Sequence, residues 1–345
     1  MERSKLKNIF SKFYSMSIFW PLMCLICIIF IDFLINPGFL KIEMKDGHLF
    51  GSLIDILNRA APLILISLGM TIVIAVQGID ISVGSVIAIS ACVSATVIVS
   101  NGPVILAIAA GLFVGLLCGM WNGFLVAYIG VQPMVGTLIL YIVGRGIAQL
   151  ITDGKILTFT NKSFIFLGTG YLLIPIPVYI AIAVILVMYF VMRKTSLGLF
   201  VEAIGVNREA SRFSGINSRK VIFALYAICG LLAGLAGLII CSNIKSADAN
   251  NAGQWLELDA ILSVVIGGTS MSGGRFYLGG TVIGALFIQS LTTTIYSIGV
   301  PPEVTLVVKA IVVITVVLIQ SPIFRKMLKT NNMFSNYKSK KVAKI

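Results

Sequence analysis

The chain has 345 residues, of which 58% are hydrophobic and 11% are charged, and its formal net charge is +13. Water-soluble domains are closer to half apolar and a quarter charged, so this composition excludes a soluble fold and predicts an all-α, polytopic transmembrane bundle. The Lys and Arg residues lie mainly in the tails and in short loops between apolar runs, as orientation signals do. We therefore expect contact with membrane lipid and no nucleic-acid partner.

About ten apolar segments follow one another, and each is expected to be a helix because hydrocarbon offers the backbone no hydrogen-bond partner. They cover residues 18–35, 58–76, 81–100, 104–128, 132–151, 172–192, 220–241, 258–271, 277–297 and 303–321. The first is longer than the core of a secretory signal and lacks a small-residue cleavage site, which indicates an uncleaved span. We expect one membrane domain over 18–321, between a cytoplasmic tail at 1–17 and a basic cytoplasmic tail at 322–345.

The basic residues are unevenly divided between the two sides of the membrane. If the N-terminus is inside, 18 Lys and Arg fall in the cytoplasmic segments and 6 in the outer loops. This bias predicts that both termini are cytoplasmic, which requires an even number of spans.

Glycines recur at four-residue intervals in three of the apolar segments. They are Gly111, Gly115 and Gly119, then Gly230 and Gly234, then Gly280 and Gly284. Such a stripe allows helices to pack closely in lipid. We expect this packing inside one bundle, with a dimerisation face as the alternative.

The first interruption of the apolar pattern, residues 77–84, contains Gly78, Asp80, Ser82 and Gly84. A carboxylate that faces lipid is unfavourable by roughly 2.5–3.5 kcal/mol on insertion scales, so Asp80 should face a cavity, a helix end or water. Two interpretations remain open. The segment is a cytoplasmic turn in which Ser82 caps the next helix and Asp80 favours its positive N-terminus, or it is a broken helix that lines a transport path.

The second interruption is rich in glycine and covers residues 267–281. Its candidate path residues are Gly267, Gly268, Thr269, Gly273 and Gly274. The spacing of Gly274 and Gly279 is that of a phosphate-binding loop, but Gly280 stands where that motif needs Lys, so we expect no ATP site. Two glycine-interrupted helix pairs in one chain are the usual sequence sign of a translocation site.

The third interruption, 193–220, is polar and cytoplasmic. Three- and four-residue steps place one set of apolar residues on one face of a short amphipathic helix: Ala203, Val206, Ala210 and Phe213. Asn207 can cap its final part, Gly215 can end it, and Arg208 and Arg212 share a neighbouring face. The segment is either an interfacial helix on lipid headgroups or, as we prefer, a docking element for a cytoplasmic partner.

At these residues the chain resembles the membrane permeases of ATP-binding cassette importers for monosaccharides, the ribose, xylose, arabinose and galactoside group. Residues 68–71 and 78–85 are similar to the family's "LGMT…GIDLSVGS" stretch. Further similar positions are Asn122-Gly123, Pro133, Gly136-Thr137-Leu138, Arg145-Gly146, Ala203-Ile204-Gly205, Asn207, Ala210, Ser214-Gly215-Ile216, Gly267-Gly268-Thr269-Ser270 and Gly273-Gly274. The match covers roughly 55–320, in order and with similar spacing.

The chain departs from the family pattern at three places. Val206 replaces a second glycine, Leu199 replaces a common Arg, and residues 277–280 vary the late glycine run. The first two lie on the cytoplasmic side, so they bear on the partner ATPase and not on the family.

The resemblance implies a permease subunit in the bacterial cytoplasmic (inner) membrane that forms the path for a pentose or hexose. It implies a second permease copy or a related permease, an ATP-binding cassette ATPase, and an extracytoplasmic sugar-binding protein. ATP and Mg would be used by the ATPase, and this chain would bind no cofactor. The segment 203–215 would couple it to the ATPase. Asp80 is the first candidate for a gate residue, with Arg145 and Lys309 as weaker ones, because Arg145 can snorkel.

The main alternative is an ion-coupled secondary transporter or channel for a small polar solute, which would favour several buried carboxylates. Apart from Asp80 the spans offer almost none. A membrane enzyme is a third alternative, but His48 is the single histidine and lies in an outer loop. Cys24 and Cys27 have no second pair near them, so we expect no metal site and no catalytic constellation.

Overall fold

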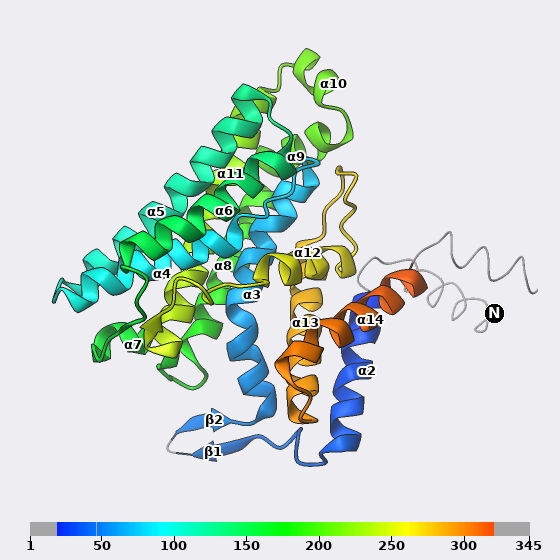
Figure 1. Ribbon diagram of the computed structural model, residues 1–345. Coiled ribbons are helices and arrows are strands. Elements are labelled where there is room, and N and C mark those ends of the chain that lie inside the picture. The colour runs from blue at the N-terminus through cyan, green and yellow to red at the C-terminus, as the bar shows by residue number, and fades with distance from the viewer. Residues whose placement is uncertain (1–18, 46, 321–345) are drawn as a thin grey trace, which may run out of the picture. The chain divides into compact units, whose positions relative to one another are not determined.

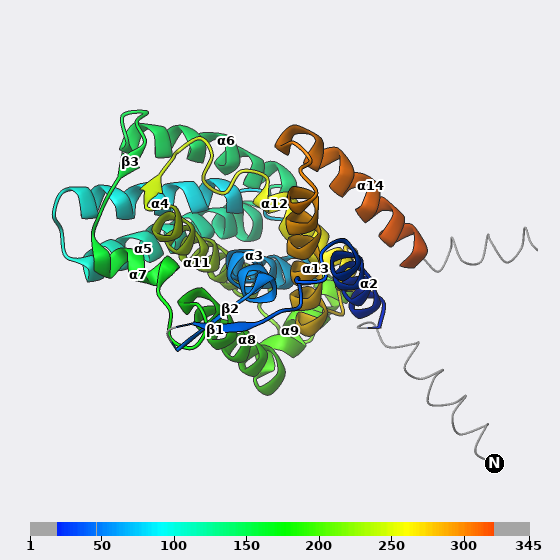
Figure 2. The ribbon, with the colours of Figure 1, turned by 90° about the horizontal axis from the view of Figure 1, so that it is seen from below.

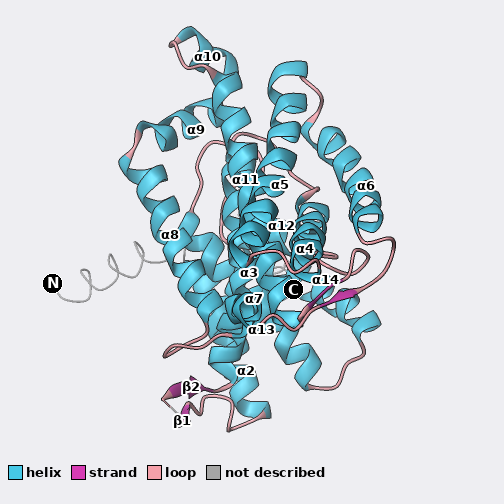
Figure 3. Cartoon of the chain, turned by 90° about the vertical axis from the view of Figure 1, so that its left-hand side faces the viewer, coloured by secondary structure: helices cyan, strands magenta, loops and turns pink. Residues whose placement is uncertain are grey.

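The computed structural model describes residues 19–45 and 47–320, and most of them are helical (Figure 1). The helices are α2 (Phe19–Ile35), α3 (Ser52–Ala75), α4 (Val83–Val99), α5 (Val104–Phe124) with a π-helical extension η1 (Leu125–Ile129), α6 (Pro133–Ile151), α7 (Lys162–Thr169), α8 (Ile176–Lys194), α9 (Ser196–Val206), α10 (Arg208–Phe213), α11 (Ser218–Ile244), α12 (Leu256–Ile266), α13 (Leu278–Ser297) and α14 (Pro302–Gln320). Two short antiparallel ribbons pair β1 (Glu43–Lys45) with β2 (His48–Phe50) and β3 (Leu157–Thr158) with β4 (Ser246–Ala247), as Figure 3 shows. The predicted tails 1–17 and 322–345 lie outside the described residues.

Each predicted apolar segment coincides with a helix, which confirms a polytopic helical membrane protein. Six helices are long and apolar enough to cross a bilayer: Ser52–Ala75, Val104–Ile129, Pro133–Ile151, Ile176–Lys194, Ser218–Ile244 and Leu278–Ser297. Helix α12 has 11 residues, so it extends about 16 Å and covers only half of the hydrocarbon thickness. The count of ten spans and the cytoplasmic position of both termini therefore remain predictions.

Several helix boundaries follow directly from the local sequence. Gly130 adopts a left-handed φ of 84° at the end of η1, and Pro133 opens α6, where a missing backbone N–H costs nothing. The side chain of Asn161 caps α7 and that of Asn217 caps α11, because each accepts hydrogen bonds from free backbone N–H groups.

Helix α3 lies in the middle of its neighbours and is buried continuously from Ala60 to Ala75 (Figure 2). It packs against α11, α8 and α12, and α11 packs in turn against α5 and α4. By contrast, α5, α6 and α8 each leave many large apolar side chains exposed, as a lipid-facing helix does. The fold thus places the interruption after α3 in the interior of the bundle.

The glycine stripes form contacts within the chain, as expected. A Cβ on Gly115 would lie 2.7 Å from the carbonyl oxygen of Gly230, and Cβ atoms on Gly119 or Gly230 would overlap the backbone of the facing helix. Helices α5 and α11 therefore approach backbone to backbone. Gly280 and Gly284 bring α13 equally close to Gly267 and to Ser263 of α12.

The chain divides into two compact units, one up to Ser290 and one from Leu291 onwards. The first contains α2 to most of α13, and the second contains the end of α13 together with α14. The prediction of one membrane domain over 18–321 remains a prediction.

Candidate functional site

The first interruption separates two helices that end and begin inside the protein. Helix α3 ends at Ala75 and α4 begins at Val83, and Gln77 between them has a φ of 64°, which is uncommon for a residue with a side chain. Gly78 passes so close to Tyr226 that a Cβ there would lie 2.7 Å from its hydroxyl oxygen. Gln77 is exposed, whereas Asp80 is completely buried and faces neither lipid nor solvent in this conformation.

Asp80 holds this interruption together by hydrogen bonds. Its Oδ1 accepts from the backbone N of Ser82 at 3.0 Å, from the Ser82 hydroxyl at 2.6 Å and from Asn122 Nδ2 at 3.3 Å. The other oxygen, Oδ2, has no hydrogen-bond partner among the described residues. The prediction that Ser82 caps α4 is wrong: its backbone is helical, and its hydroxyl donates to Asp80 and accepts from Asn122 at 2.7 Å. The N-cap position of α4 is still Ser82, but no side chain caps the helix there.

The second interruption runs from the end of α12 at Ile266 to the start of α13 at Leu278. Gly268, Gly273 and Gly274 have φ values of 88°, 78° and 91°, a backbone conformation that side chains disfavour. At its base a Cβ on Gly267 would lie 2.6 Å from the carbonyl carbon of Gly280. Thr269 is buried, and its Oγ1 accepts from the backbone N of Tyr277 at 3.1 Å. The glycines therefore serve both as turn residues and as contact points.

All three interruptions meet at one place, which we call the glycine junction: Ala75, Gln77, Gly205, Gly273 and Gly274. The backbone N of Gly274 donates to the carbonyl of Ala75 at 2.9 Å. Gln77 Nε2 donates to the carbonyl of Gly205 at 2.8 Å. A Cβ on Gly205 would overlap both the Ala75 oxygen and the Gly274 nitrogen. The cytoplasmic segment predicted for docking thus touches both helix breaks through backbone atoms.

Arg193 makes a second link between the cytoplasmic segment and the late glycine run. Its Nη2 donates to the carbonyl of Phe276 at 3.2 Å, and the guanidinium carbon lies 5.3 Å from the centroid of the Phe276 ring. Its Nη1 lies 3.6 Å from Glu202 of α9. Arg193 is the first residue of the third interruption, and nothing in the sequence places Phe276 beside it.

The segment that was predicted to be cytoplasmic forms two helices and not one, which corrects the predicted amphipathic helix. Asn207 is extended, with φ of −157° and ψ of 108°, and its Oδ1 accepts from the backbone N atoms of Glu209 and Ala210. It therefore ends α9 and caps α10, and Gly215 follows α10 at a φ of 85°. Because of this break, Val206 is 75% exposed and Phe213 is 90% exposed, whereas Ala203 is partly buried.

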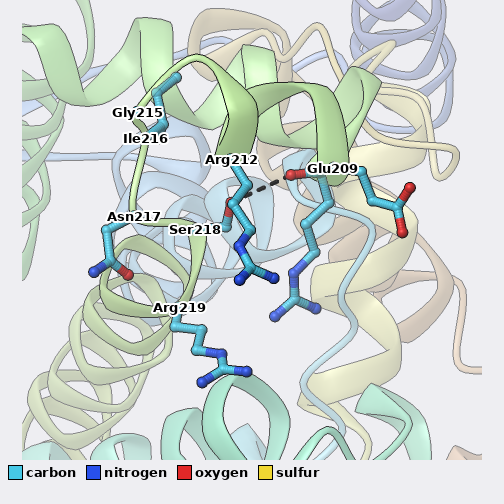
Figure 4. Close-up of a pocket in the computed structure, with 8 residues that line it drawn as sticks. Glu209, Arg212, Gly215, Ile216, Asn217, Ser218 and Arg219 are labelled. Atoms are coloured by element: carbon cyan, nitrogen blue, oxygen red, sulfur yellow. Dashed lines mark hydrogen bonds between the residues drawn. The ribbon is translucent and has the colours of Figure 1, made fainter.

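A basic pocket of about 560 Å³ lies beside α10. Arg208 and Arg212, one turn apart on α10 as predicted, line it together with Arg219 from the start of α11. Figure 4 shows Arg212 and Arg219 extending into the same space, while the Ser218 hydroxyl donates to the carbonyl of Arg208 at 3.5 Å. Three guanidinium groups around one hollow favour acidic groups as partners.

Comparison with known proteins identifies the family. The family of branched-chain amino acid transport system permease components matches residues 52–317. The chain belongs to this permease family. It is similar to the galactofuranose transporter permease protein YtfT of Escherichia coli, with 48% identity over 90% of this chain and 93% of the relative. No solved structure matches it.

Two further relatives have the same kind of description. The fructose import permease protein FruF of Bifidobacterium longum is 37% identical over 98% of this chain and 95% of its own length. The ribose import permease protein RbsC of Bacillus subtilis is 38% identical over 87% of this chain and 91% of its own length. The predicted family is confirmed, and the chain is a transport permease of the cytoplasmic (inner) membrane.

Proposed function

We propose that the chain forms the translocation path for a monosaccharide, a pentose or a hexose, in an ATP-binding cassette importer. An extracytoplasmic binding protein delivers the sugar, a partner ATPase uses ATP and Mg, and a second permease completes the path. This chain hydrolyses nothing and binds no cofactor. The relatives named for galactofuranose, fructose and ribose support the substrate class. The observation that carries the mechanism is the glycine junction.

The junction supports a mechanical role for the cytoplasmic segment. Phe213 and the arginines of α10 are exposed, so they are available to the ATPase. When α10 is displaced, α9 moves with it, because the two helices are joined at Asn207. At Gly205, α9 contacts the end of α3 and the loop after α12 with no space between them. Because close-packed backbone does not deform gradually, we propose that α9, the end of α3 and the loop after α12 move as one body. The two inputs, nucleotide and sugar, then favour different positions of that body.

The path residues predicted from the sequence have distinct roles in this proposal. Gly78, Asp80, Ser82 and Gly84 form the first half of the gate, in which Asp80 stabilises the break from within. Residues Gly267, Gly268, Thr269, Gly273 and Gly274 form the second half. The coupling residues are Ala203, Gly205, Asn207, Arg208, Ala210, Arg212, Phe213 and Gly215.

The docking surface is tested by reversing its charge. Arg208→Glu combined with Ala210→Glu is expected to abolish co-purification of the ATPase, because both positions are exposed on α10 and the change reverses the net charge of this helix and removes one of the three arginines that line the pocket. Membrane insertion should be unchanged, since neither side chain is packed in the bundle. The measurement is the ratio of ATPase to permease after affinity purification from membranes.

A control is Lys155→Glu, which likewise replaces an exposed basic residue by Glu, in the loop after α6 and outside the docking segment. This control should leave the ATPase-to-permease ratio at the wild-type value. A normal ratio in the double variant would exclude α10 as the docking element.

The transport class is tested in proteoliposomes that contain the permease, the ATPase and the binding protein. Uptake of radiolabelled galactofuranose, fructose or ribose should persist after collapse of the proton gradient and stop when ATP is withheld. The opposite result would establish the ion-coupled alternative.

A further inference from the structure

A further buried carboxylate, besides those of Asp32 and Asp80, lies one position before the predicted span 258–271. Glu257, in the first turn of α12, is 2% exposed. Its Oε2 has no hydrogen-bond partner among the described residues, although a buried and unpaired polar atom is unfavourable. A Cβ on Gly84 would overlap Oε2 of Glu257 and would also lie 2.8 Å from the carbonyl oxygen of Gly253. The carboxylate is thus placed against the first turn of α4.

Arg145 of α6 faces the same region and binds a loop of this chain. Its Nη1 donates to the carbonyls of Ala249 at 3.1 Å and Ala252 at 2.6 Å, in the loop that leads to α12. Its Nη2 is buried and has no partner in the part of the chain that the structure describes. The guanidinium is therefore held through Nη1, whereas Nη2 has no hydrogen-bond partner among the described residues.

The loop that fixes Arg145 is itself held in shape by Asp248. Its two carboxylate oxygens accept hydrogen bonds from the backbone N of Asn250 at 2.9 Å and from Asn251 Nδ2 at 2.7 Å. Partial burial acts to raise the pKa of Asp248, but these hydrogen bonds outweigh it, so its pKa lies below the ordinary value. The carboxylate is charged at neutral pH, and the loop carbonyls stay in position for Arg145.

Glu257 and Arg145 attract each other electrostatically but do not touch. Each charge acts on the other, yet none of the ion pairs among the described residues joins them. A group that bridges the two must accept from a guanidinium N–H and donate to a carboxylate oxygen. A hydroxyl does both, whereas the charge of Arg145 disfavours a cation.

Trp255 adds an aromatic surface directly before α12. Its φ is 66°, which is an uncommon backbone conformation for a bulky residue, and its side chain is 44% exposed. Strained backbone of this kind is retained where the surrounding structure requires it, often at binding sites. Here it places an exposed indole two residues from Glu257, of which one carboxylate oxygen, Oε2, has no hydrogen-bond partner among the described residues.

We propose that Arg145, Trp255 and Glu257 form a subsite on the permease that binds a hydroxyl group of the transported sugar. Glu257 accepts the hydroxyl hydrogen, Arg145 donates to the hydroxyl oxygen, and Trp255 supplies an apolar surface for the sugar ring. The inference rests on the proposed function, since it requires that the cargo is a monosaccharide. It also gives the paired helix breaks a chemical role, because α4 and α12 both begin at this subsite.

The test uses the complete transporter in proteoliposomes and measures sugar transported per ATP hydrolysed, with the first of ribose, fructose or galactofuranose that the wild type carries. Glu257→Gln is expected to lower this ratio about tenfold or more, because it removes one charge-assisted hydrogen bond to the sugar. ATP hydrolysis should continue. Asp259→Asn, in the same first turn of α12, is the matched control and should keep the wild-type ratio.

A second measurement detects binding of the sugar directly and does not depend on transport. Trp20→Phe with Trp121→Phe leaves Trp255 as the single one of the 3 tryptophans in the chain. The same sugar should then change the tryptophan fluorescence of the reconstituted permease in a saturable way, and Glu257→Gln should remove this change.

Three results would overturn the subsite. The first is an unchanged ratio in Glu257→Gln, and the second is a parallel fall of uptake and hydrolysis at normal abundance, which indicates a structural role. The third is a Trp255 fluorescence that no sugar alters. A wild-type transporter that carries none of the three sugars would instead refute the proposed function, and the subsite with it.

Discussion

Gly205→Ala is expected to lower sugar uptake about tenfold or more, because the added methyl group overlaps backbone atoms on two sides and overpacking of this kind costs about 1–3 kcal/mol. The clash can be relieved only if α9 moves away from Ala75 and Gly274. The exposed surface of α10 is unchanged by such a movement, so the ATPase should still bind and hydrolyse ATP. The expected phenotype is therefore uncoupling, measured as uptake and hydrolysis in the same proteoliposomes.

The matched control is Gly146→Ala in α6. This glycine has open space around the position of a Cβ, and its backbone is helical. Alanine is favoured over glycine in a helix by roughly 1 kcal/mol, so the control should be at least as stable as the wild type and should transport normally. Normal uptake in Gly205→Ala would show that the junction is not a tight contact.

Asp80→Ala is expected to prevent accumulation of the folded permease. The substitution leaves the backbone N and hydroxyl of Ser82 and the amide of Asn122 without the oxygen that they share. Unpaired buried groups cost about 1–3 kcal/mol each, which is a large fraction of the stability of a typical protein. The measurement is the amount of monodisperse permease recovered from membranes.

Asp80→Asn separates support of the fold from a charge in the path. Asparagine keeps an oxygen in the position of Oδ1 and replaces Oδ2, which has no hydrogen-bond partner among the described residues. We therefore expect normal abundance and substantial uptake in this variant. Normal abundance with no uptake would mean that the negative charge itself acts on the cargo or the gate.

The sequence was sufficient to predict the helices and the three interruptions, because lipid requires continuous apolar helices and leaves glycine and charge only where they have a partner. It also identified the cap formed by Asn207, which depends on neighbours in the chain. The close packing at Gly115 and Gly230 could also be predicted from the sequence, since a four-residue repeat of glycine defines one face of a helix.

The sequence could not show that the three interruptions meet, because the contact of Gly205 with Ala75 and Gly274 depends on how α3, α9 and the loop after α12 pack. The periodicity of apolar residues continued across Asn207 and concealed the break between α9 and α10. Glu257 lies one position before the predicted span 258–271, so its burial was missed. The signal that could have found it is an acid at the start of a short apolar helix.

A cross-link between α9 and the second break tests whether the two move as one body. A Cβ on Gly274 would lie 3.2 Å from Cγ2 of Val206, so Val206→Cys with Gly274→Cys places two cysteines within disulfide reach. The two single variants control for the strain of a side chain at Gly274. Oxidised and reduced double variants are compared for ATP-driven sugar uptake. If α9 and the second break move as one body, the cross-linked transporter should keep its uptake. A loss of uptake on oxidation that reduction restores would contradict this movement.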